Sequence, residues 1–305
     1  MDLSFNFSDE DFIAEEDLKR SKKGLTCSSY EARLDTPEWF FLSNEEVNPK
    51  LILNRLKFRG DYDYARKQMD EAISEYLALL DAMREGKGNL PLKREVLESL
   101  SRSYLKTNKP NGGEEALKYA LLFHSTSNPV NPCNLFASFD LLTLVYLFLG
   151  NQPQMAHYCI IQMLHHRPLT PRVWGLLGDS YSTKDDTKAA ASWLRAIGLY
   201  ESVNKTVGPI VKEQNGKFID ALKNKVEGKE LDEGLLSDLR RQMTKDLVNE
   251  IGEQRGEDFQ DLGASKRMKP LEEGIQSPPP DDDSMRDFDI NWDLVVAFEK
   301  KWFSF

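Results

Sequence analysis

Apolar residues recur along much of this chain every three or four positions, which is the period of amphipathic α-helices. Glycine and proline separate these helical segments, and between the aromatic segment 30–42 and Lys205 the segments come in pairs. The first helix of three pairs has an aromatic residue or Leu, then Leu, a small residue and Tyr at one fixed spacing. These sets are Leu97, Leu100, Ser101, Tyr104; Phe139, Leu142, Thr143, Tyr146; and Trp174, Leu177, Gly178, Tyr181.

This spacing is the first-helix signature of the tetratricopeptide repeat, a two-helix unit of 34 residues. Leu97, Phe139 and Trp174 lie 42 and 35 residues apart, which fits such a repeat with one lengthened loop. Each motif alone is a loose pattern, but three motifs at matching spacing are strong evidence for the repeat. The sequence therefore predicts an all-α fold, a tetratricopeptide-like right-handed helical solenoid of about four helix pairs with N- and C-terminal capping segments.

The second helices support this prediction. In such repeats a small Ala admits close packing, and an aromatic residue four positions later fills the neighbouring groove. Ala72 and Tyr76 fit this pattern after Leu56 and Gly60.

The composition divides the chain into five predicted parts. Residues 1–29 are an acidic, mostly disordered tail, or contain a short docking segment. Residues 30–200 form the repeat domain, beginning with an aromatic cap around Trp39, Phe40 and Phe41. Residues 201–255 are a charged helical extension that caps the repeats or binds a partner. Residues 256–287 are a disordered linker, and residues 288–305 form a C-terminal amphipathic helix.

Charge and cysteine content narrow the function classes. The net charge of −10 disfavours binding to nucleic acid or to an acidic membrane surface. Three cysteines do not suggest a disulfide framework or a C-x2-C zinc site. The first 20 residues do not resemble a signal peptide, and the apolar run 141–149 is short for a membrane span. We expect an intracellular protein, cytoplasmic or nuclear, without membrane or nucleic-acid partners.

Few residues suggest chemistry. His165 and His166 are adjacent, so on a helix they point about 100° apart and do not share a metal ion. Cys159 lies in an apolar helix, where a buried structural thiol is favoured over a reactive one. No phosphate-binding loop or hydrolase, kinase or metalloprotease motif is present. We therefore expect no catalytic residue, metal or cofactor, and no enzyme activity.

The concave groove of the repeats is the predicted binding site. First helices line such grooves through residues that flank the core positions. Chaperone-binding repeats use Lys and Asn there to hold a carboxylate; Lys57 matches the Lys, but Asp61 stands where the Asn should be. The predicted groove residues are Asn54, Lys57, Asp61, Tyr64, Glu98, Arg102, Asp140, Arg172 and Asp179. Their mixed charge suggests an extended polar peptide, and the alternative is that these charges are merely solvated.

These patterns suggest a non-enzymatic scaffold or adaptor that binds a partner protein's peptide or helix in the groove. The alternative is a structural subunit of a larger intracellular complex, docking through its solenoid edge and C-terminal helix. That helix is predicted to dock back onto the repeats, or into a partner, through Trp302 and Phe303.

Four segments also resemble a known family. They are Tyr30-x-Ala-x-Leu34-x-x-Pro37-x-Trp39-Phe40, Leu56 to Asp61, Ala72-x3-Tyr76 and Phe298-Glu299-x-Lys301-Trp302-Phe303. Together they are similar to the animal family named after the human chromosome 8 open reading frame 76 protein. The resemblance implies a tetratricopeptide-like helical domain. It implies no catalytic residues and no particular biochemical activity.

Overall fold

The computed structural model describes residues 39–41, 52–84, 89–107, 109–127, 131–247 and 291–304. The chain divides into two compact units, residues 1–48 and 49–305. In the first unit, the described residues form the short 3-10 helix η3, Trp39–Phe41. The predicted tail 1–29, most of the predicted cap and the predicted linker 256–287 lie outside the described residues.

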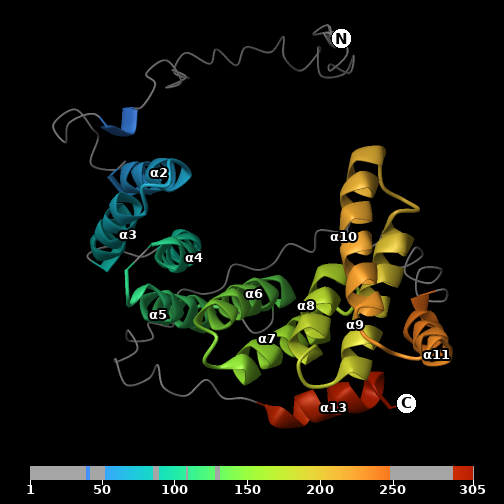
Figure 1. Ribbon diagram of the computed structural model, residues 1–305. Coiled ribbons are helices and arrows are strands. Elements are labelled where there is room, and N and C mark those ends of the chain that lie inside the picture. Colours follow the sequence, from blue (N-terminus) through green and yellow to red (C-terminus); the bar gives the residue numbers. More distant parts are fainter. Residues whose placement is uncertain are drawn as a thin grey trace, which may run out of the picture. The chain divides into compact units, whose positions relative to one another are not determined.

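The second unit is built from consecutive pairs of helices (Figure 1), and its described residues contain helices but no strand. The four pairs are α2 (Ile52–Ala65) with α3 (Met69–Arg84), α4 (Leu90–Lys106) with α5 (Gly112–Ser125), α6 (Pro132–Leu149) with α7 (Pro153–His166), and α8 (Pro171–Tyr181) with α9 (Asp186–Val203). The second helix of each pair also packs on the first helix of the next. The predicted all-α, tetratricopeptide-like fold class is confirmed.

The small residue of the signature lets the two helices of a pair approach closely. A Cβ atom at Gly178 would lie 2.4 Å from the Trp193 ring, and one at Gly60 would lie 2.6 Å from the Tyr76 ring. Ser101 uses the same position differently, because its hydroxyl donates a hydrogen bond to the carbonyl of Ala116 at 2.9 Å. The signature therefore predicts a close contact between the two helices of a pair, as well as the buried face of the first helix.

The helix ends follow local sequence signals. Asn131 accepts hydrogen bonds from the first turn of α6, and Asp185 does the same for α9. Gly150 ends α6 in the left-handed conformation, at φ 67°, which suits glycine. Short connections such as this one bring the next helix back against the previous one.

Three further helices extend the core beyond the four pairs: α10 (Pro209–Glu227), α11 (Glu233–Thr244) and α13 (Trp292–Trp302). Helices α10 and α11 pack on α9, and α13 packs on α7. Leu239 and Met243 of α11 face the core and are each 1% exposed. The compact unit therefore includes helices on both sides of the predicted boundary at residue 200.

Helix α6 is the most apolar helix of the repeats. Its 18 residues satisfy a length and hydropathy test for a membrane span, a test that core helices of soluble proteins also pass. One face of α6 lies in the core, where Leu141, Leu142 and Val145 are fully buried.

Candidate functional site: the groove face and the α13 contact

The predicted groove residues lie on the four first helices, and none of them is buried. Asn54, Lys57, Asp61 and Tyr64 belong to α2, Glu98 and Arg102 to α4, Asp140 to α6, and Arg172 and Asp179 to α8. Because the signature residues of each helix turn inward, the positions between them are left at the surface. We call the surface that these positions form along the four first helices the groove face.

Most charges of the groove face already have a partner. The Lys57 ammonium lies 2.6 Å from the carboxylate of Asp61 and 3.7 Å from that of Glu95. Asp61 also accepts a hydrogen bond from the Tyr76 hydroxyl at 2.8 Å. Asp61 therefore neutralises the lysine that a carboxylate-binding groove would need.

Two further ion pairs follow the same pattern. Arg102 pairs with Glu98 one helical turn away, at 2.9 Å. Arg172 of α8 donates to the carboxylate of Asp140 on α6, and thus joins the groove faces of two successive repeats. The sequence suggested a mixed groove, and the structure shows that these opposite charges are matched within it.

The carboxylate of Asp179 is held by two helices that do not carry the predicted groove residues, α9 and α10. It accepts a hydrogen bond from the Trp193 indole at 3.0 Å and lies 2.6 Å from the ammonium of Lys225 on α10. Leu222 of α10 also lies 3.6 Å from the Cβ position of Gly175. Helix α10 therefore contacts this end of the groove face.

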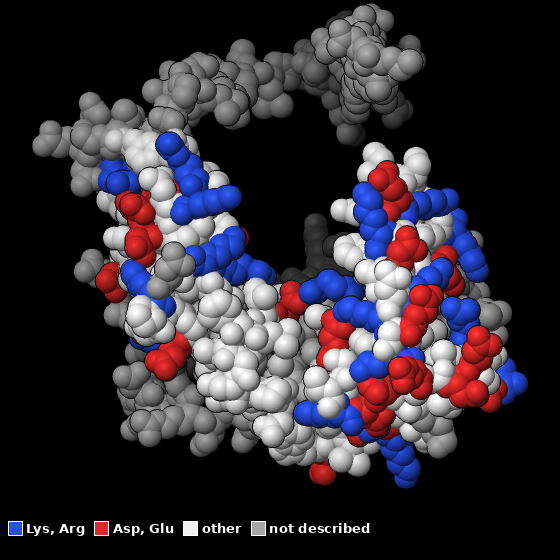
Figure 2. Space-filling model, in the orientation of Figure 1, with Lys and Arg blue, Asp and Glu red and all other residues white. Residues whose placement is uncertain are grey.

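The groove face also contains exposed apolar residues, of which Leu147 and Phe148 are not among the groove residues predicted from the sequence. Leu147 and Phe148 of α6 are 50% and 57% exposed, and Leu144 is 43% exposed. Figure 2 shows an area without charged side chains over α6 and α7, beside Lys and Arg side chains near α4. The helical register that places Asp140 on the groove face also leads to these residues when it is continued along α6.

The predicted docking residues of the C-terminal segment lie against the fourth repeat. The Trp302 ring centroid is 5.1 Å from that of Trp174, and the Phe303 centroid is 5.5 Å from that of Tyr181. Phe298 packs beside Trp174 at 5.8 Å. Phe303 is buried and Trp302 partly buried, so the apolar face of α13 is occupied within the chain.

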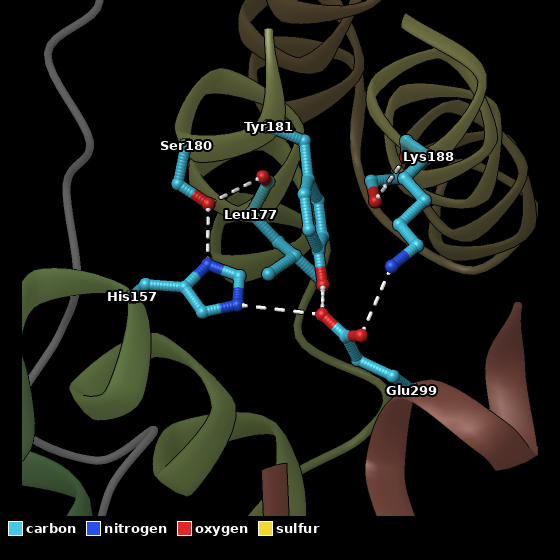
Figure 3. A network of polar contacts seen from close by, with 7 residues as sticks. His157, Leu177, Ser180, Tyr181, Lys188 and Glu299 are labelled. Carbon is cyan, nitrogen blue, oxygen red and sulfur yellow. Dashed lines mark hydrogen bonds and ion pairs between the residues drawn. The ribbon is translucent and has the colours of Figure 1, made fainter. Parts of the chain in front are cut away.

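A polar network fixes the other side of this contact (Figure 3). Glu299 of α13 accepts hydrogen bonds from the Tyr181 hydroxyl and, at 2.9 Å, from the Lys188 ammonium. Nε2 of His157 lies 3.8 Å from the same carboxylate. Although burial opposes this shift, these hydrogen bonds and cationic neighbours lower the pKa of Glu299.

His157 also contacts the fourth repeat through its other ring nitrogen. Its Nδ1 lies 2.9 Å from the Ser180 hydroxyl, which in turn lies 2.8 Å from the Leu177 carbonyl, and the tautomer of His157 decides which group donates. Burial lowers the pKa of His157 to about 4, with help from Lys184 and Lys188 and against the pull of Glu299. His157 is therefore neutral at pH 7 and positions α13.

The described residues contain no cluster of three or more His, Cys, Asp or Glu that would hold a metal ion. An open cleft of about 550 Å³ lies beside α13, with Leu164, Pro168 and Phe298 among its lining residues. The network does place the Ser180 hydroxyl 2.9 Å from Nδ1 of His157, but this hydroxyl is partly buried and also lies 2.8 Å from the Leu177 carbonyl.

Comparisons with known proteins place the chain in a family. Residues 4–226 match the model of DUF5588, described as a family of unknown function. Human "Uncharacterized protein C8orf76" is 25% identical over 187 residues, or 60% of this chain and 45% of that protein. The Rattus norvegicus homolog is 28% identical over 175 residues, or 56% of this chain and 43% of that protein. The matches thus span less than half the length of these relatives.

A solved structure, "Crystal structure of MamA protein", aligns with a TM-score of 0.38 and 20% identity over 60% of this chain and 98% of that one. This likeness is too distant to bear on function. The family model ends before α13, so the C-terminal part of the noted resemblance lies outside the matched residues. Because the model matches more than half of the chain, this protein belongs to DUF5588, the family of the C8orf76 proteins.

Proposed function

We propose that this protein is a non-enzymatic interaction scaffold that binds a peptide or helix of a partner protein on its groove face. The observation that supports the proposal is the exposed apolar surface of α6, at Leu144, Leu147 and Phe148, in the middle of the repeats. Large apolar side chains left in water at one place on a folded domain commonly mark an interaction site.

The environments of the candidate reactive residues support a non-enzymatic role. Cys159 is fully buried, and burial raises the pKa of its thiol, which disfavours the nucleophilic thiolate. His166 stacks on Phe139 with ring centroids 6.3 Å apart, while His165 beside it is exposed. These arrangements suit structural residues better than catalytic ones.

The proposal is tested by affinity capture of the tagged protein from its native cells. The variant Lys57→Glu/Arg102→Glu reverses two groove charges, leaving Asp61 and Glu98 beside new carboxylates. The control Lys217→Glu/Arg241→Glu changes the net charge equally at exposed positions on α10 and α11. We expect partners to be lost from the groove variant and retained by the control. Equal retention by both variants, and also by Leu147→Ser/Phe148→Ser, would contradict groove binding.

A structural subunit remains the second candidate, and exposed apolar residues outside the groove favour it. Ile210 on α10 is 82% exposed and Val296 on the outer side of α13 is 64% exposed. In that case Ile210→Ser/Val296→Ser should reduce co-purification while the groove variant does not. Substitution of Trp302 and Phe303 tests whether α13 stays bound to the fourth repeat, because their ring contacts hold it there.

We also propose an intracellular location, cytoplasmic or nuclear, with proteins as partners and neither nucleic acid nor membrane. The net charge of −10 supports the exclusion of nucleic acid. Cell fractionation tests the location. Salt-dependent binding of the purified chain to DNA or RNA would contradict the partner class.

A further inference from the structure

The ion pairs of the groove face leave little unmatched charge for a ligand. A peptide carboxylate approaching Lys57 would compete with Asp61, whose oxygen lies 2.6 Å from the ammonium. One approaching Arg102 would compete with Glu98 at 2.9 Å. Exchanging one exposed ion pair for another contributes little free energy, of the order of 0–1 kcal/mol in typical cases. Polar contacts at these pairs are therefore a weak source of affinity.

The exposed residues Leu144, Leu147 and Phe148, which we call the α6 patch, have no such internal partner for their outer surfaces. Their spacing places them together on one face of the helix. The Phe148 ring lies 3.4 Å from the Cβ position of Gly113, so the start of α5 supports one side of the ring. Supported apolar side chains that remain about half exposed suit a partner's apolar anchors.

One cation at the C-terminal end of α4 is not neutralised by a carboxylate in the described residues. Lys106, the last residue of α4, donates to the Tyr64 hydroxyl at 2.5 Å, and its ammonium lies 4.1 Å from the Tyr64 ring centroid. Both of these partners are uncharged. The ammonium of Lys106 is thus available to pair with a carboxylate of a ligand.

Lys106 and the α6 patch approach the same turn of the chain. The turn after α4 leads into Gly112, whose Cβ position lies 2.8 Å from the Tyr104 carbonyl oxygen, and the next residue, Gly113, contacts Phe148 and Leu149. Helices α4 and α6 are also in contact. A single bound segment can therefore reach both features.

We propose that the groove ligand is an amphipathic protein segment with at least two large apolar side chains and a nearby carboxylate. The apolar side chains contact the α6 patch, and the carboxylate pairs with Lys106. This inference rests on the proposed groove-binding function and replaces the extended polar peptide suggested by the sequence. The matched ion pairs around the patch hold the first helices and exclude strongly charged segments.

A lipid surface is a less suitable occupant than a protein. The opposite face of α6 belongs to the core, where Phe139, Leu142 and Tyr146 pack, so insertion of this helix would dismantle the third repeat. The neighbouring Asp140–Arg172 pair would also have to leave water. An amphipathic segment covers the α6 patch without either cost.

The test measures binding of synthetic peptides to the purified full chain by fluorescence polarisation. Three sets of equal length are compared: apolar–acidic, apolar–basic and polar–acidic. We expect the apolar–acidic set to bind at least about tenfold more tightly than the others, because only this set provides both apolar area and a partner for Lys106.

Three variants assign the contacts. Leu147→Ser/Phe148→Ser should weaken binding of the apolar–acidic set at least about tenfold. Lys106→Glu should move the preference toward the apolar–basic set. Ile210→Ser, which changes a more exposed apolar residue on α10, should leave binding unchanged. Circular dichroism checks that each variant keeps its helices.

The possible failures have separate meanings. Preferential binding of the polar–acidic set, abolished by Lys57→Glu/Arg102→Glu, would overturn this inference and leave the proposed function standing. Failure of every set to bind overturns the inference, and if capture is also unaffected by groove variants, the proposed function fails too. Binding to phosphatidylcholine vesicles, or a dimer in light scattering, that is lost on Leu147→Ser/Phe148→Ser would instead assign the patch to lipid or to a second copy.

Discussion

The guanidinium carbon of Arg195 lies 4.6 Å from the ring centroid of Trp302, so the fourth repeat holds α13 partly through a buried cation. Arg195 is fully buried. Its Nη1 donates to the Met243 carbonyl at 2.6 Å and to the carboxylate of Asp246. One side chain of α9 therefore contacts residues of two of the three added helices, α11 and α13.

Replacement of Arg195 by Met should destabilise the fold. The substitution keeps an apolar stem but removes the ring contact and the two hydrogen bonds, leaving the Met243 carbonyl without this donor. We expect the free energy of unfolding, measured in urea, to fall by about 3 kcal/mol. Arg241→Met, at an exposed pair on α11, should change it by less than about 1 kcal/mol. Similar losses in both variants would contradict the role given to Arg195.

Gly178 should be intolerant of a methyl group. The added Cβ would lie 2.4 Å from the Trp193 ring, so Gly178→Ala should destabilise the protein by about 1–3 kcal/mol. A Cβ atom added at Gly216 on α10 would meet open space. Gly216→Ala should therefore stabilise the protein by about 0.5–1 kcal/mol, because alanine has the higher helix propensity. Thermal unfolding measures both effects. If Gly178→Ala also stabilises, the close interhelical contact is wrong.

Acid should release α13. The pKa of His157 is lowered from its ordinary 6.5 to about 4 and that of Glu299 is also lowered, so both contribute stability that is present above their unfolded pKa values. The contribution of His157 should be lost as pH falls from about 6.5 to 4, up to about 3 kcal/mol. Hydrogen exchange of residues 292–302 at several pH values measures this loss.

The matched variant for this experiment is His157→Gln, which removes the titrating ring. Its pH dependence between about 6.5 and 4 should be shallower than that of the unaltered chain, although α13 is held less firmly at pH 7. Identical pH profiles for the two proteins would show that another group controls the release of α13.

The repeats could be predicted from sequence because their information is local. The spacing of Trp174, Leu177, Gly178 and Tyr181 within one helix reports both the buried face and the close approach to Trp193. The same register identified the outward positions of the groove face. Continued along α6, it also reaches Leu147 and Phe148.

The remaining contacts join residues far apart in the chain, and no local pattern specifies them. Glu299 meets Lys188 across 111 positions, and the charged stretch that contains Lys188 offers Lys184 as an equivalent candidate. Arg195 resembles an ordinary surface arginine in sequence, but Trp174, Met243 and Trp302 from three other helices lie around it in the fold. The apolar face of α13 could therefore be predicted, but its polar anchor and the buried cation beneath it could not.

The most direct test of the scaffold hypothesis is photo-crosslinking in native cells from single positions on the surface. A benzoylphenylalanine residue placed at Leu147 on the groove face is compared with one placed at Lys217 on α10, whose side chain is 74% exposed. We predict a discrete covalent adduct with a partner protein from position 147 and none from position 217. Adducts from position 217 alone would contradict binding on the groove face.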